Sequence, residues 1–143
     1  MKKKMTNVLM VFALIFSVLT VCMPNAQAYD KNLYGDDNYI LVYGHMDVAW
    51  YLDKSSVVVK QNDKNAHAFA QNIVIVDPTG KITKTKTYWY YQAVKRDNYN
   101  EALFSEDGEK WKSFDVNSEF GFMQVVVNGF KTGWSVAFGC GWS

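Results

Sequence analysis

The chain carries few of the residue types that enzymes use for nucleophilic or metal-assisted catalysis. Its 143 residues include two histidines and two cysteines. His45, Asp47 and Asp53 could form a metal site or a hydrolytic dyad, but the sequence has neither a His-x-x-x-His nor a Cys-x-x-Cys pair, the spacings that metal ligands often adopt. His45 also follows a glycine in an expected turn, where a solvated histidine is the ordinary outcome. We therefore expect no catalytic residues, no metal and no cofactor.

The remaining histidine and the C-terminal cysteine favour structural roles. Cys140 lies between Gly139 and Gly141, and free cysteines are among the most frequently buried residues. We expect its thiol to be buried and inert, with an intermolecular disulfide that joins two copies as the alternative. His67 alternates with Phe69 along one strand face, which indicates a histidine at the end of a sheet rather than a ligand or a base.

The N-terminus has the pattern of a secretory signal peptide. Three lysines at positions 2–4 precede an apolar stretch from Val8 to Val21, and Ala26-Gln27-Ala28 supplies a cleavage site with small residues. Cleavage near Ala28 would release residues 29–143 as a secreted, cell-surface or periplasmic domain. Lipidation of Cys22 is the alternative. A permanent membrane span is not expected, because a spanning helix needs about 20 apolar residues.

The charge of the remaining chain argues against a nucleic-acid partner. Removing the three leader lysines from the 15 basic residues leaves 12 basic against 14 acidic residues. Proteins that bind nucleic acids usually carry a basic excess, because neutralisation of phosphates dominates their affinity.

Alternation of apolar and polar residues with period two predicts a sheet. The clearest unit is a long hairpin from 66–76 and 82–92, because Asp77-Pro78-Thr79-Gly80-Lys81 between them has Pro and Gly where a tight turn needs them. A shorter hairpin, 99–105 with 110–114, is expected around the Asp-Gly pair at 107–108.

The N-terminal part of the domain predicts an arm and further strands. Residues 29–38 are polar and rich in turn formers, so we expect an exposed arm. Residues 39–43 and 48–53 are β-branched and aromatic, and a break at Lys54-Ser55-Ser56 separates the latter from a third strand at 57–60.

The C-terminal part predicts one helix. Phe120, Met123, Val126, Val127 and Phe130 recur with helical spacing. Asp115, Asn117 or Ser118 could cap the start of this helix, and Gly129 or Gly133 could end it. A pair of strands is the alternative, and the tail at 134–142 is expected to pack back, as a strand.

These elements add up to a single α+β domain: about six antiparallel strands, with one C-terminal helix packed on the sheet. Tyr88-Trp89-Tyr90-Tyr91 places rings on both faces of one strand, so one pair is expected in the core. We take Tyr88 and Tyr90, together with Lys84 and Lys86 on the same face, as candidate binding residues. A simple solvated edge is the alternative for the lysines.

A short motif gives the one resemblance to a known family. Trp50-Tyr51-Leu52-Asp53-Lys54-Ser55-Ser56-Val57 resembles the aromatic-x-Asp-x-Ser-Ile/Val motif near the start of the bacterial surface-adhesin protein E-like domains. The resemblance implies an antiparallel sheet with a helix against it and an adhesive role without catalysis. It also implies a disulfide between the helix and the sheet, for which Cys140 has no partner here. Asp53 and Ser55 are expected to satisfy backbone groups of a turn rather than to form a site.

The sequence therefore favours an exported, non-enzymatic, adhesin-like binding module that contacts a protein or a glycan through aromatic residues of its sheet. A secreted enzyme inhibitor or an envelope-associated structural protein, acting through a loop, is the alternative. A hydrolase built on His45, Asp47 and Asp53 is the third hypothesis. The oligomeric state stays open, with a dimer through Cys140 as one option.

Overall fold

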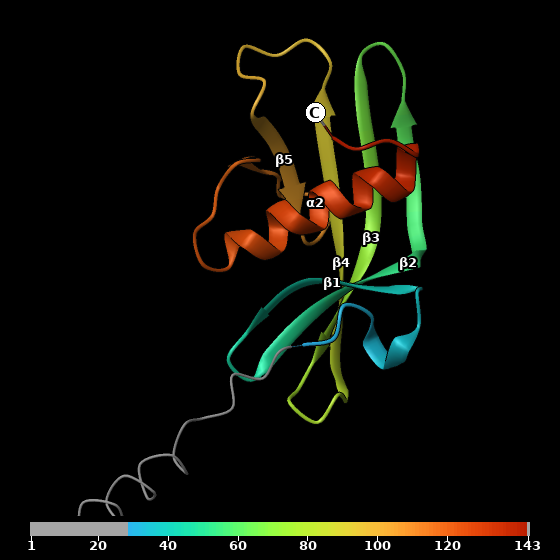
Figure 1. Ribbon diagram of the computed structural model, residues 1–143. Coiled ribbons are helices and arrows are strands. Elements are labelled where there is room, and N and C mark those ends of the chain that lie inside the picture. Colours follow the sequence, from blue (N-terminus) through green and yellow to red (C-terminus); the bar gives the residue numbers. More distant parts are fainter. Residues whose placement is uncertain (1–28, 143) are drawn as a thin grey trace, which may run out of the picture.

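Six strands follow one another through an antiparallel sheet, in the order of the chain (Figure 1). The computed structural model describes residues 29–142. The strands are β1 (Tyr39–His45), β2 (Val48–Asn62), β3 (Ala66–Val76), β4 (Ile82–Ala93), β5 (Glu101–Ser105) and β6 (Lys112–Asp115). A 3-10 helix, η1 (Leu33–Gly35), precedes them, and one α-helix, α2 (Met123–Phe138), follows. The expected α+β domain is confirmed.

The long hairpin of β3 and β4 is the element that local sequence chemistry determines most fully. The Asp77 carboxylate accepts hydrogen bonds from the Thr79 N–H, the Thr79 hydroxyl and the Lys81 N–H, at 2.9, 2.7 and 3.1 Å. Gly80 takes a φ of +84°, a conformation that favours glycine. The strands then pair from Val76 with Ile82 to Ala66 with Ala93.

The expected break at Lys54–Ser56 is wrong, because β2 continues through it as a bulge. The register with β3 shifts between Asp53 and Val58. Asp53 Oδ1 accepts from the Ser55 N–H and hydroxyl, at 3.0 and 2.6 Å. The Ser56 hydroxyl donates to the Asp53 carbonyl at 2.6 Å and accepts from the Asn72 N–H at 2.7 Å. Side chains thus replace the ladder bonds that the extra residues interrupt.

The C-terminal helix is longer than its sequence predicts. It begins at Met123 and runs to Phe138, where Gly139 ends it in the left-handed conformation, with φ of +70°. Gly129 and Gly133 are therefore inside the helix rather than at its end, and the tail at 134–138 is helix rather than strand. No side chain caps the first turn, so the expected capping roles of Asp115, Asn117 and Ser118 are also wrong.

The two internal glycines let the helix approach the sheet closely. A Cβ atom on Gly129 would lie 2.8 Å from the Tyr90 hydroxyl, and one on Gly133 would lie 2.6 Å from the Phe69 ring and overlap the Gln71 amide. Gln71 Nε2 donates to the Gly129 carbonyl at 2.8 Å. The glycines bear no side chain here because the sheet fills that space.

The main core lies between α2 and the sheet face that it crosses in Figure 1. Its members are mostly aliphatic and aromatic residues of all six strands and the helix. The largest fully buried ones are Leu52, Phe69, Ile73, Tyr88, Tyr90 and Phe130. Phe69 stacks on Tyr90 and Phe130, with ring centroids 5.1 and 6.0 Å apart.

The N-terminal arm is less exposed than expected. Leu33 in η1 is buried in a second, smaller core with Ala49, Tyr51, Val74 and Val76, on the face of the sheet away from α2. Asn32 bridges to Ile40, and the Leu41 N–H donates to the Lys31 carbonyl at 2.8 Å. The arm therefore covers one end of that face and leaves the other end uncovered.

The expected signal peptide, residues 1–28, lies outside the described residues. Within residues 29–142, no helix combines the length and the apolarity needed to cross a membrane.

We expect Gly133→Ala to destabilise the domain. The alanine methyl would overlap Gln71 and Phe69 in a packed core, and overpacking of this kind costs about 1–3 kcal/mol. Urea unfolding followed by circular dichroism should show that decrease in the free energy of unfolding.

Gly141→Ala is the matched control, because a Cβ there meets no atom within 4 Å, and its unfolding midpoint should be unchanged. Equal stability of the Gly133 variant and the wild-type domain would contradict the described seating of α2.

Candidate binding surface

The expectation that Tyr88 and Tyr90 form a contact surface is corrected by their burial. Both side chains lie in the main core and are fully buried. The Tyr90 hydroxyl donates to the Val126 carbonyl of α2 at 3.1 Å, and the Tyr88 ring packs edge-to-face on Phe104 with centroids 6.0 Å apart. Tyr90 thus joins α2 to the sheet, and Tyr88 packs beside it in the same core.

Burial also keeps both phenols neutral. It raises the pKa of Tyr90 well above its ordinary value, and burial together with the Glu106 carboxylate raises the pKa of Tyr88. Within residues 29–142, the buried Tyr88 hydroxyl meets no hydrogen-bond partner. Both phenols are therefore protonated near neutral pH.

Lys84 and Lys86 lie on a part of β4 that β5 does not reach. β5 pairs with Trp89, Tyr90 and Tyr91 only, so the first half of β4 is an edge of the sheet. Lys84 is exposed, and Lys86 Nζ forms an ion pair with Glu106 Oε1 at 2.8 Å. Protruding lysines are a common way to prevent the pairing of sheet edges. Lys84 and Lys86 therefore do not form a contact surface together with Tyr88 and Tyr90, which are buried.

The other two rings of the Tyr88–Tyr91 run form a surface on the opposite face. Trp89 and Tyr91 are half-buried, and the Tyr91 ring contacts Trp111 edge-to-face, with centroids 6.3 Å apart. The Lys60 ammonium lies 5.2 Å from the centre of the Trp89 ring, within the range of a cation–π interaction. We call Lys60, Trp89, Tyr91 and Trp111 the aromatic face.

The aromatic face belongs to neither hydrophobic core of the described residues. Trp111 retains 41% of its exposure. The neighbouring positions on β3 are small, because Trp89 is opposite Ala70 and Tyr91 is opposite Ala68. The rings therefore stand beside a shallow strip of the sheet.

The turn between β5 and β6 positions Trp111. Gly108, with φ of +78°, lies against the Trp89 ring, and a Cβ there would be 3.4 Å from it. The Asp107 carboxylate accepts from the backbone N–H groups of Lys110 and Glu109, at 2.8 and 2.9 Å, and from the Ser105 hydroxyl at 2.9 Å. This tight turn brings Trp111 back over the sheet beside Tyr91.

Sequence reasoning missed Lys60 and Trp111. Trp89 and Tyr91 could have been found from the sequence, because alternate residues of a strand face opposite sides and Tyr88 and Tyr90 are the buried pair. Lys60 and Trp111 reach the same face only through strand pairing between distant segments, and no local pattern contains that information.

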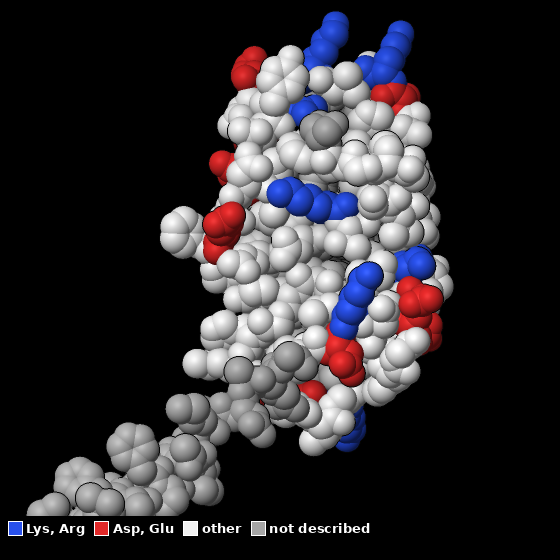
Figure 2. Space-filling view, in the orientation of Figure 1, with Lys and Arg blue, Asp and Glu red and all other residues white. Residues whose placement is uncertain are grey.

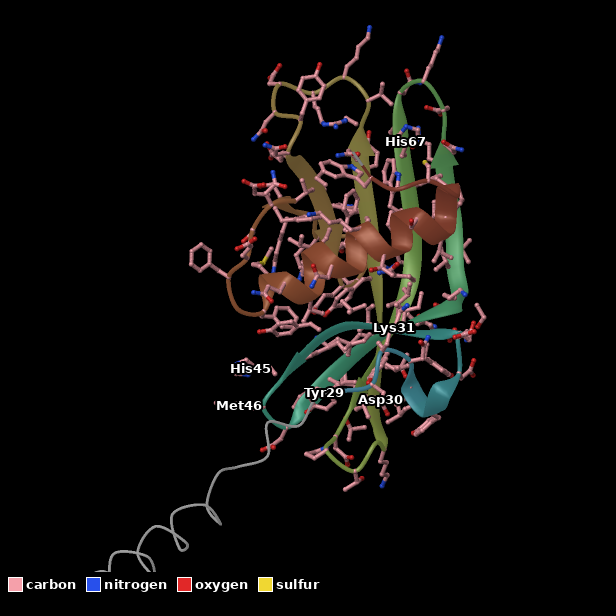
Figure 3. All side chains as sticks on the ribbon, in the orientation of Figure 1. Tyr29, Asp30, Lys31, His45, Met46 and His67 are labelled. Atoms are coloured by element: carbon pink, nitrogen blue, oxygen red, sulfur yellow. The ribbon has the colours of Figure 1, made fainter. Side chains whose placement is uncertain are left out.

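The residues of the hydrolase hypothesis are not brought together. His45 pairs with Val48 at the tip of the β1–β2 ladder, whereas Asp53 pairs with Tyr39 at its other end. Asp53 is engaged by Asn38 Nδ2 at 2.8 Å. Figure 3 shows His45 and His67 far apart, with His67 near the top of the view and His45 at the lower left. Among residues 29–142, no group of three or more His, Cys, Asp or Glu side chains could hold a metal ion.

His67 and Cys140 line a cleft of about 240 Å³ beside the end of α2, with Gln92, Arg96, Trp134 and Trp142. His67 Nδ1 lies 2.8 Å from Asn62 Oδ1, and its ring packs on Trp134 and Phe138, as expected for a histidine at the end of a sheet. Cys140 is exposed, so the expectation of a buried thiol is wrong.

The helix-bearing face carries charges of both signs. Figure 2 shows acidic and basic side chains interspersed over this face, with no broad basic area. A nucleic-acid surface would require such an area.

Comparison of the chain with protein-family models, curated proteins and solved structures gives no match.

We expect the Asp107 carboxyl to titrate at an unusually low pH. The Lys110 and Glu109 N–H groups and the Ser105 hydroxyl lower its pKa from 3.8 to about 2. Because the folded pKa is below the unfolded one, the turn is stabilised above about pH 4, and this contribution is lost as the pH falls through about 2. NMR titration of the carboxyl carbon measures the midpoint.

Ser105→Ala removes one of the three donors and should shift the Asp107 midpoint upward. The Asp77 carboxyl, in the β3–β4 turn, should titrate identically in both proteins. An Asp107 midpoint near 3.8 in the wild-type domain would contradict the described turn.

Proposed function

We propose that this chain is an exported, non-enzymatic, adhesin-like binding module that contacts a protein or glycan partner at the bacterial surface through the aromatic face. The observation that carries the proposal is the position of Trp89, Tyr91 and Trp111, which lie together outside both cores.

The composition of the aromatic face supports a binding role. Tryptophan and tyrosine are enriched among residues that dominate binding energy, because they bring a large contact area at a low cost in side-chain entropy. The Lys60 ammonium beside Trp89 adds a positive charge at the rim. A sheet surface with rings standing on it suits an extended partner better than a small molecule, which usually needs a concave pocket.

The arrangement of titratable groups supports binding rather than catalysis. His45 and Asp53 are separated by the length of the β1–β2 ladder, and the buried phenols of Tyr88 and Tyr90 stay protonated. The proposed location at the cell surface depends on the leader pattern of residues 1–28.

A second candidate, a secreted inhibitor that acts through a loop, is favoured by the tip between β1 and β2. Met46 adopts a φ of +50°, which is unusual for a side-chain-bearing residue, and retains 79% of its exposure. The Tyr29 hydroxyl donates to its carbonyl at 2.7 Å, which ties the tip to the N-terminal arm.

We expect Trp111→Ala and Tyr91→Ala to weaken binding of residues 29–143 to bacterial surface material. Loss of a central aromatic contact should reduce the affinity about tenfold or more. Titration of the fluorescently labelled domain against surface fractions measures this change. Protease treatment of the fractions should abolish binding to a protein partner, and periodate oxidation should abolish binding to a glycan.

Two control variants define the outcome. Phe120→Ser removes an aromatic ring that is 85% exposed and lies away from the aromatic face, so binding should be unchanged. Met46→Gly tests the tip, because glycine tolerates the positive φ. If the Trp111 and Tyr91 variants bind fully and the Met46 variant does not bind, the binding surface is the tip between β1 and β2 and not the aromatic face.

A further inference from the structure

The edges of the sheet are protected to different degrees. Beside β1, the Leu41 N–H is paired with the Lys31 carbonyl, and Asn128 Nδ2 of α2 donates to the Val42 carbonyl at 3.0 Å. β6 is only four residues long and begins with Lys112. The free half of β4 carries Lys84 and Lys86. Each of these features discourages the addition of another strand.

The second half of β2 has no covering segment and no outward-pointing charge among the described residues, and its one irregularity is a shift of register with β3 between Val59 and Gln61. β1 pairs with β2 only up to Asp53, and no other described strand pairs with the outer side of residues 57–62. In Figure 1 this part of β2 is the right-hand edge of the sheet. Val58 and Val59 retain 48% and 42% of their exposure. An edge with free backbone groups and exposed valines is suited to pairing with a further strand.

The one charged residue in this stretch does not block the edge. Lys60 extends over Trp89 of its own sheet, with Nζ 5.2 Å from the ring centre. The polar groups of the preceding bulge are also satisfied within the chain, since Ser55 and Ser56 bond to Asp53. The exposed side chains of this stretch before Lys60, Val58 and Val59, are therefore apolar and uncharged, and Val57 beside them packs against the main core.

We propose that two copies of this chain pair antiparallel through the outer edge of β2, about a two-fold axis that passes through Val58. A two-fold axis perpendicular to the sheet places residues of the same face opposite each other. An axis at Val58 puts Val58 opposite its own copy, Val57 opposite Val59 of the second copy, and Ser56 opposite Lys60.

Neighbouring registers are less favourable. An axis at Val59 would place Val58 opposite Lys60, and an axis at Lys60 would place the two ammonium groups opposite each other. Like charges that face each other across a strand pair are destabilising. The Val58 register is the one that pairs all three valines with valines.

The pairing would extend the aromatic face across both copies. Val58 is opposite Ala70, and Ala70 is opposite Trp89, so all three share one row on the same face. Two such rows would meet at the axis and present Trp89, Tyr91 and Trp111 of both copies on one surface. This use of the dimer rests on the proposed function, whereas the pairing itself does not.

Sedimentation equilibrium of residues 29–143, which contain both cores, tests the pairing. The wild-type domain should show the mass of a dimer at high concentration. Val58→Lys places two positive charges at the axis and should give the mass of a monomer, with an unchanged circular dichroism spectrum. Thr85→Lys adds the same charge at an exposed position of β4 and should stay dimeric.

Disulfide trapping tests the register. In a Cys140→Ser background, Val58→Cys should form an intermolecular disulfide on oxidation, because residues directly opposite each other are within disulfide reach. Val59→Cys should not, since the two thiols would be offset by two residues on each strand.

Four results would overturn the proposal: a monomer at every concentration, a dimer that Val58→Lys leaves intact, a dimer that is lost in Cys140→Ser, or preferential trapping at position 59. Trp111→Ala should remain dimeric, so a failure of the proposed function can be distinguished from a failure of the pairing.

Discussion

The seating of α2 on the sheet is the contact on which the rest of the structure depends. Two carbonyls in the middle of the helix accept hydrogen bonds from the sheet, Gly129 from Gln71 and Val126 from Tyr90. These bonds require a backbone approach that only Gly129 and Gly133 permit. A buried donor left unpaired is costly, so these two bonds favour one position of the helix and one face of the sheet for it to cover. Within residues 29–142, the opposite face is covered by the N-terminal arm at one end and is bordered by the β5–β6 turn at the aromatic face.

The bulge in β2 has the next largest effect on the arrangement of the sheet. Asp53, Ser55 and Ser56 take up the extra residues with side-chain hydrogen bonds, and after them β2 continues without β1 beside it. One strand therefore contributes to both cores in its first half and forms an open edge in its second half. The motif that carries the family resemblance has a structural role here, as expected for Asp53 and Ser55, although within a strand rather than at its end. The resemblance itself remains a prediction.

The sequence predicted what local chemistry determines and missed what depends on distant contacts. The β3–β4 hairpin was predictable, because Asp77, Pro78 and Gly80 specify its turn. The helix end was not predictable, because glycine favours the end of a helix by propensity. Gly133 nevertheless lies inside the helix, where Gln71 occupies the space that a side chain would need. The same limit applies to the candidate site. Period two divides Tyr88 and Tyr90 from Trp89 and Tyr91, but both pairs are aromatic, and only the position of α2 decides which one is buried.

The five tryptophans of the chain allow a direct test of the central claim that one face is closed by the helix and the other is free for a partner. Trp89 and Trp111 lie on the aromatic face, whereas Trp50, Trp134 and Trp142 pack against the main core. Their indole N–H resonances can be followed by NMR while surface material is added. The account predicts that the signals of Trp89 and Trp111 shift or broaden while the other three stay in place. Perturbation of Trp50, Trp134 or Trp142 alone would contradict it.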